Sequence, residues 1–328
     1  MIAAVFADGW AHLNVASTRE SFFTPSHAAL YSGFLATAGW LAWPLIEGRG
    51  DLHRRLARLA PGYGLGLVGA LLFGLGGVLD LVWHAGFGIE VSLEALLSPT
   101  HLLLLTGGLL VLTTPIRSTW RDLSSPSTIR GLAPTLIATG LSMAVVAFFL
   151  AYAWGVLDPL PTLPVDPVAL DEAAAGHLAA ERLLATGLLA RLVTTVLLIS
   201  PLLLLARRWD VPVGSTTVLY ALVGVPMAVL LGDALLEPVA PTAAMLAAGV
   251  LTDGAVAWLR PGPGRPQGAR RLGLLAPIIL WGTNLGALAV APGITWSPEL
   301  WSGTVVMTAL LGLGLALLAF PPDTPQPS

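Results

Sequence analysis

The sequence has no cysteine and no lysine, and it is poor in charge of either sign. The absence of cysteine excludes disulfide bonds, thiolate metal sites and cysteine nucleophiles. Charged residues make up 11% of the 328 residues, against roughly 25% in soluble globular domains. Hydrophobic residues make up 55%, and the mean hydropathy is +0.80. The chain is therefore predicted to lie in a lipid bilayer, and no nucleic-acid partner is expected.

Long apolar runs recur along the chain, and each can cross a hydrocarbon core about 30 Å thick. We predict an all-α polytopic membrane protein of about nine transmembrane helices, with residues 1–328 as a single integral membrane domain. Residues 1–12 are too short to span and are predicted to form a half-helix or an interfacial segment. The predicted spans are 28–46, 63–83, 99–116, 132–156, 178–205, 215–236, 241–259, 272–291 and 300–320.

All sixteen basic residues are arginine, and most of them fall in alternate connecting segments. The positive-inside rule predicts that these segments are cytoplasmic. The N-terminus then faces outward and the C-terminus is cytoplasmic. The all-arginine usage and the richness in Ala, Gly and Pro indicate a bacterial plasma membrane protein. The arginines concerned are Arg49, Arg54, Arg55, Arg58, Arg117, Arg121, Arg130, Arg207, Arg208, Arg260, Arg265, Arg270 and Arg271.

One short pattern occurs twice on the predicted outer side: Asp-x-x-x-His, a loop, then Ser/Thr-Pro-Ser/Thr-His. Positions i and i+4 share a helix face, so the Asp and first His of each copy should point the same way. The second His should lie on the first turn of the next helix, where a proline is well placed. One carboxylate and two imidazoles predict a transition-metal site with an open coordination position. The predicted ligands are Asp8, His12 and His27, and Asp80, His84 and His101.

Two alternatives stay open for this pattern. The aspartate could orient an imidazole instead of binding the metal itself. The two copies could also share one two-metal cluster instead of forming two sites. Glu20 and Glu94 each lie seven residues before the second His and are candidate proton carriers or additional ligands.

The two copies also predict an internal repeat of outward-facing helical hairpins. Residues 1–116 would hold the complete copies, 132–205 a partial copy, and 215–320 degenerate scaffold copies. In the partial copy, Asp158 and His177 are weaker candidate ligands. The simpler explanation, that Pro and Ser/Thr start helices well, accounts for the Ser-Pro and Thr-Pro pieces but not for the recurring Asp and His.

A few further charged residues fall in or near the predicted spans, among them Glu181 and Arg191. We expect Arg191 to pair with another helix, for example through Asp233 or Asp253. A proton or ion route is the functional alternative, because ionisable groups within a membrane are costly.

Residues 8–34, DGWAHLNVASTRESFFTPSHAALYSGF, resemble the metal-binding segment of the C subunit of copper membrane monooxygenases, the particulate methane and ammonia monooxygenase family. The shared features are Asp-x-x-x-His, an Arg-acidic pair at Arg19 and Glu20, and Phe-Thr-Pro-Ser-His ending at His27. The resemblance implies that Asp8, His12 and His27 are metal ligands, and the repeat at 80–108 extends this role to its own Asp and two His. The His–His interval is two residues longer here than in that family.

The resemblance implies copper, with zinc as the alternative that imidazole chemistry leaves open. We expect possible oxygenase or redox chemistry on a small apolar substrate at the outer membrane face, which would need an electron donor and partner membrane subunits. Two alternatives of other classes are a transporter of metal ions or small solutes, and a non-catalytic membrane scaffold or accessory subunit.

Overall fold

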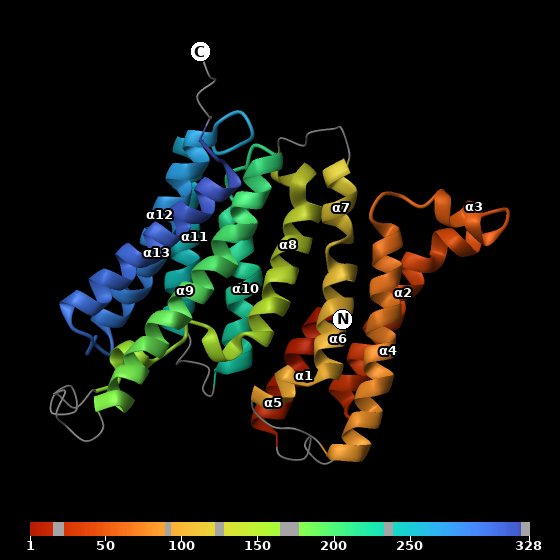
Figure 1. The fold of residues 1–328 in the computed structure, drawn as a ribbon, viewed down its shortest axis with the longest axis horizontal. Coiled ribbons are helices and arrows are strands. Elements are labelled where there is room, and N and C mark those ends of the chain that lie inside the picture. The colour runs from red at the N-terminus through yellow and green to blue at the C-terminus, as the bar shows by residue number, and fades with distance from the viewer. Residues whose placement is uncertain (16–22, 89–92, 122–127, 165–176, 233–238, 323–328) are drawn as a thin grey trace. The chain divides into compact units, whose positions relative to one another are not determined.

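The computed structural model describes residues 1–15, 23–88, 93–121, 128–164, 177–232 and 239–322. Helices account for most of these residues, and no strand occurs among them. Figure 1 shows the order of the helices along the chain. The α-helices are α1 (Ile2–Asn14), α2 (Pro25–Glu47), α3 (Leu52–Ala57), α4 (Tyr63–Phe87), α5 (Leu93–Leu97), α6 (Pro99–Leu112), α7 (Thr114–Arg121), α8 (Ile129–Phe149), α9 (His177–Arg208), α10 (Ser215–Leu231), α11 (Val239–Leu259), α12 (Pro266–Val290) and α13 (Pro298–Ala319).

The prediction of an all-α polytopic membrane protein is confirmed. Within the described ranges, eight helical segments are long and apolar enough to cross a membrane, with α6 and α7 counted together as Pro99–Arg121. The predicted span 215–236 corresponds to α10, which is apolar but has 17 described residues. Segment 1–12 forms the short helix α1, as expected for a half-helix.

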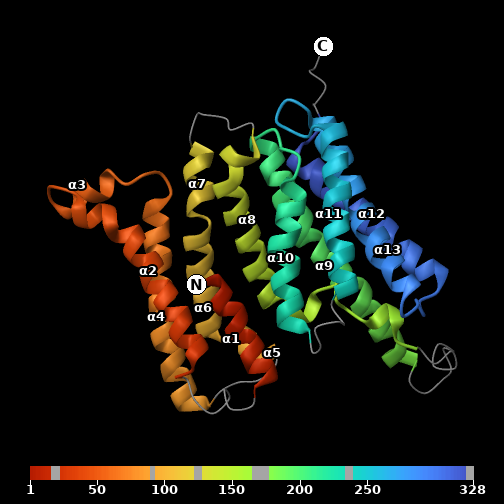
Figure 2. The ribbon, with the colours of Figure 1, turned by 180° about the vertical axis from the view of Figure 1, so that it is seen from behind.

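The chain divides into two compact units. The first contains Met1–Ser125, Ala133–Phe149 and Val229–Asp233, and the second contains Pro126–Leu132, Leu150–Ala228 and Ala234–Ser328. In the first unit, α1 packs on α2, and α4 packs on α6. Figure 2 shows these helices from behind. Phe6 of α1 also meets Phe148 of α8 edge to face, with ring centroids 5.4 Å apart.

Glycines allow α4 and α6 to approach closely. A Cβ on Gly69 would lie 2.7 Å from the carbonyl oxygen of Gly107, and a Cβ on Gly107 would lie 2.5 Å from the amide of Phe73. Side chains at these two positions would force the backbones apart. Small residues serve this purpose in membranes, where helices associate through van der Waals packing and hydrogen bonds.

The second unit is built around α9, which packs against α12 and α13. The predicted span 132–156 is too long at its end, because α8 stops at Phe149 and residues 151–153 form a 3₁₀ turn. Other helices bond this irregular backbone: Gly155 N–H donates to Thr194 Oγ1 at 2.8 Å, and Asn284 Nδ2 donates to the carbonyl of Val156 at 3.0 Å. Non-helical backbone is tolerated at membrane depth only with such partners.

Candidate metal centres

The first Asp-x-x-x-His pattern forms a cluster between α1 and α2. Asp8 and His12 lie one turn apart on α1, and His27 lies in the first turn of α2. His27 Nε2 is 3.2 Å and His12 Nε2 is 3.7 Å from Asp8 Oδ2. Thr24 caps α2, because its side chain accepts the N–H of His27, and Pro25 occupies the first position of the helix. The Thr-Pro pair before it thus fixes the position of His27 in the first turn of α2.

The second pattern forms an equivalent cluster between α4 and α6. Asp80 and His84 lie one turn apart on α4, and His101 lies in the first turn of α6. His84 Nε2 is 3.4 Å from Asp80 Oδ2, and His101 Nδ1 is 3.5 Å from Asp80 Oδ1. Ser98 takes the capping role of Thr24, since it accepts the N–H of His101. Asp80 is buried, with 2% of its surface exposed.

Each cluster has the donors and the spacing that a transition-metal ion needs. One ligand atom from each of the three residues lies within 4.8 Å of the other two, in both clusters. Metal–ligand bonds of about 2.0–2.2 Å place neighbouring ligand atoms of a tetrahedral ion roughly 3.3–3.6 Å apart. The carboxylate–imidazole distances of 3.2–3.7 Å therefore need little adjustment on binding. Three protein ligands leave a fourth position open.

A hydroxyl group donates a hydrogen bond to each aspartate. Ser26 Oγ donates to Asp8 Oδ1 at 2.6 Å, and Thr100 Oγ1 donates to Asp80 Oδ1 at 2.7 Å. Both hydroxyls come from the residue just before the second His of the motif. Sequence reasoning missed this role, although the second Ser/Thr of Ser/Thr-Pro-Ser/Thr-His carried the signal. Hydrogen bonds of this kind orient metal ligands.

The state of two ligand groups follows from their neighbours. Burial alone would raise the pKa of the Asp8 carboxyl group, but hydrogen bonding and Coulomb attraction from His27, with help from Ser26 and His12, lower that pKa below its ordinary value. Asp8 is thus an anion ready to bind a cation. His84 Nδ1 lies 3.1 Å from the carbonyl of Gly88. With a metal ion at Nε2, a proton on Nδ1 would bond this carbonyl and orient the ring.

Tyr31 lies between the two clusters. Its ring is one turn from His27 on α2, with ring centroids 6.2 Å apart. On its other side it packs against Gly77 of α4, one turn before Asp80. The described residues thus hold two separate three-residue groups linked by one aromatic side chain, and this residue was not found from the sequence.

The other residues predicted as metal ligands or proton carriers are not among the described members of either cluster. Glu20 lies outside the described residues. The backbone of Glu94 is in α5, but its side chain is not among those described. Asp158 and His177 belong to neither three-residue group. His177 begins α9, and Asp158 instead pairs with an arginine.

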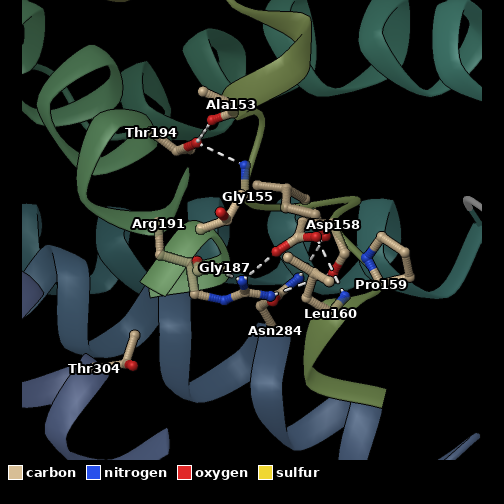
Figure 3. A network of polar contacts seen from close by, with 12 residues as sticks. Ala153, Gly155, Asp158, Pro159, Leu160, Gly187, Arg191, Thr194, Asn284 and Thr304 are labelled. Carbon is tan, nitrogen blue, oxygen red and sulfur yellow. Dashed lines mark hydrogen bonds and ion pairs between the residues drawn. The ribbon is translucent and has the colours of Figure 1, made fainter. Parts of the chain in front are cut away.

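Arg191 forms the buried ion pair that was expected between segments, but with a different partner. Its Nη1 lies 2.7 Å from Asp158 Oδ2, and its side chain is fully buried (Figure 3). The rings of Trp281 and Trp296 flank the guanidinium, at 5.6 and 4.9 Å from Cζ to the centroids. The expected pairing with Asp253 is wrong, because that carboxylate accepts the backbone N–H groups of residues 216 and 217.

The other expected partner, Asp233, lies outside the described residues. Since Arg191 and Asp253 are both held in fixed contacts, neither supports the proton or ion route that their position in the spans suggested.

Comparison of the chain with protein-family models, curated proteins and solved structures found no match.

Proposed function

We propose that the protein is a membrane metalloprotein that binds two transition-metal ions in its first unit, one at each Asp-His-His cluster. The observation that carries this proposal is the repeated geometry: two clusters built from different helices bring the same three residue types within bonding range of one ion. A single cluster of this kind could be a set of hydrogen bonds at a membrane interface. Two clusters with matching helix caps and matching hydroxyls on the aspartate argue for a shared chemical task.

We further propose that the metal is copper and that its chemistry is redox or oxygenase chemistry on a small apolar substrate. The choice of copper rests on the resemblance of residues 8–34 to the copper monooxygenase segment, since imidazole and carboxylate ligands also suit zinc. Bound copper, held by the Asp and the two His of each cluster, would supply one-electron redox chemistry. Oxygenation also needs an electron donor, so partner subunits belong to the proposal.

In this function the protein's own residues hold the metal ion and orient its ligands. Asp8 and Asp80 supply the negative charge that offsets the cation. The hydroxyl groups that donate to these two carboxylates fix their orientation. Because every arginine-rich segment is proposed to be cytoplasmic, both clusters would face the outer side of a bacterial membrane.

Elemental analysis of protein purified in mild detergent tests the proposal. We expect close to two copper ions per chain in the unchanged protein and close to one after His84→Ala or His12→Ala. His177→Ala is the matched control, because it removes a histidine outside both clusters, and it should leave the copper content unchanged. Zinc in place of copper would overturn the redox assignment but keep the sites. A folded protein that takes up no metal on reconstitution would overturn the function as a whole.

A further inference from the structure

The end of α4 opposite the second cluster borders a cavity of about 360 Å³. It lies between the α3–α4 turn and α7, and all of its lining residues belong to the first unit. Its walls combine leucines with two guanidinium groups and an indole ring. The residues that the argument uses are Leu56, Leu59, Leu65, Arg117, Trp120 and Arg121.

The protein itself fixes one of these guanidinium groups in place. Arg117 Nη2 donates to Thr114 Oγ1 at 3.1 Å and to the carbonyl of Gly62 at 3.4 Å, and Nη1 bonds Thr113 Oγ1. Gly62 has a φ of +90°, and a Cβ there would lie 2.9 Å from the Cβ of Arg117. The tight turn and the arginine therefore form one preorganised wall.

The positive charge of this wall has no internal counter-ion in the part of the chain that is described. All the oxygens that bond Arg117 are neutral, and its buried Nε has no hydrogen-bond partner. Neither Arg117 nor Arg121 forms an ion pair with a described carboxylate. Asp122 follows in the sequence and lies outside the described residues. An anion from outside would complete the site.

The position of the cavity favours a lipid over a soluble anion. The span Pro99–Arg121 ends at its rim, and the span Tyr63–Phe87 begins there. The ends of membrane spans are expected at the level of lipid headgroups, where tryptophan is enriched and arginine meets phosphate. The leucines offer an apolar wall that a free phosphate does not need.

We propose that this cavity binds the phosphate of an anionic lipid headgroup between Arg117 and Arg121, with the start of an acyl chain on the leucines. The site is independent of the metal clusters, since Gly62 and Asp80 lie at opposite ends of α4. Its ligand class is a lipid phosphodiester with net negative charge.

Lipid retention tests this site. The protein is placed in mixed micelles with phosphatidylglycerol and phosphatidylcholine of the same acyl chains, and the lipid that stays bound is counted by mass spectrometry. We expect retained phosphatidylglycerol to exceed phosphatidylcholine. Arg121→Gln should weaken that retention roughly fivefold, the equivalent of about 1 kcal/mol for one basic residue near a charged lipid surface.

A second variant fills the cavity and keeps both arginines. Gly64 lines the cavity, and a Cβ there meets nothing within 4 Å, so Gly64→Leu should fold and still exclude the lipid. Gly39→Leu is its control, since that position on α2 is equally open but lies away from the cavity. Arg54→Gln is the charge control, because this exposed arginine pairs with Asp51.

The outcomes separate the possible ligands. Selective loss in Arg121→Gln and Gly64→Leu, with both controls unchanged, supports the site. Equal loss in Arg54→Gln would overturn it, because the attraction would then come from the diffuse charge of the surface. Full displacement of the lipid by millimolar inorganic phosphate would also overturn it and assign the cavity to a soluble anion.

Discussion

Tyr31 and Gly77 meet where α2 passes α4, and the contact leaves no room for a larger residue on α4. A Cβ on Gly77 would lie 2.7 Å from Tyr31 Cε1 and 2.8 Å from its hydroxyl oxygen. Because Tyr31 stands one turn from His27, and Gly77 one turn from Asp80, this contact sets the spacing between the two Asp-His-His clusters.

Gly77→Ala should therefore disturb both stability and metal content. Pushing the Tyr31 ring aside overpacks the contact, which typically costs about 1–3 kcal/mol in free energy of unfolding. The measurement is unfolding in detergent together with elemental analysis. Gly74→Ala is the control, because a Cβ there meets only Phe34 carbons at 3.5 Å or more. If both alanine variants behave alike, the contact does not set the spacing.

The two bound ions should be close enough for their spins to interact. One helix turn joins His27 to Tyr31, a direct contact joins Tyr31 to Gly77, and one more turn joins Gly77 to Asp80. With the usual spacing of helix neighbours one turn apart, this path places the two ions less than about 25 Å from each other. Pulsed electron paramagnetic resonance on the copper(II)-loaded protein should give one distance in this range. His84→Ala should abolish it by removing one spin. A distance well beyond this range would contradict the arrangement of α2 and α4.

The hydroxyl groups that donate to the two aspartates should raise the affinity of each cluster for its metal ion. Ser26→Ala and Thr100→Val each remove one hydrogen bond to a carboxylate, and loss of such an outer partner typically lowers metal affinity about 10–100-fold. Competition with a chromophoric chelator measures the change.

The same two helices provide matched controls for this series. Ser32 and Thr106 bond only carbonyls of their own helices, Ala28 and Leu102, so Ser32→Ala and Thr106→Val should leave the affinity unchanged. Equal losses in all four variants would mean that the hydroxyls act through general packing.

The ion pair of the second unit should contribute mainly to folding. Asp158→Asn leaves the buried Arg191 charge unpaired, which typically costs about 3–5 kcal/mol. Replacing both residues with leucine should recover much of that loss. Asp51→Asn is the control, since its pair with Arg54 is exposed and such pairs are worth about 1 kcal/mol or less. An unfolding midpoint unchanged by Asp158→Asn would show that another group neutralises Arg191.

The grouping of each Asp with its two His could be predicted from the sequence because its geometry is local. Asp8 and His12 are four residues apart on one helix, and Thr24-Pro25 fixes the start of the next one. The membrane character followed in the same way from the length of the apolar runs.

Other features depend on how helices pack, and no local pattern carries them. Tyr31 resembles any interfacial tyrosine until Gly77 of another helix lies against it. The partner of Arg191 is 33 residues away, just beyond the predicted span 132–156, and the chain there is irregular because α8 ends at Phe149.

That irregular segment is hydrogen-bonded to residues of α9 and α12 and to the residue Thr295 that precedes α13. The amide of Gly155 is bonded to a side chain of α9, the carbonyl of Val156 to a side chain of α12, and the carbonyls of Pro161 and Leu163 to Thr295 just before α13. An amide outside the α-helices and without a partner in its own segment, such as that of Gly155, would normally exchange its hydrogen quickly. Here Gly155 can open only when its tie to α9 breaks, so its amide should exchange as slowly as the helix core and report on the cooperative opening of the whole unit.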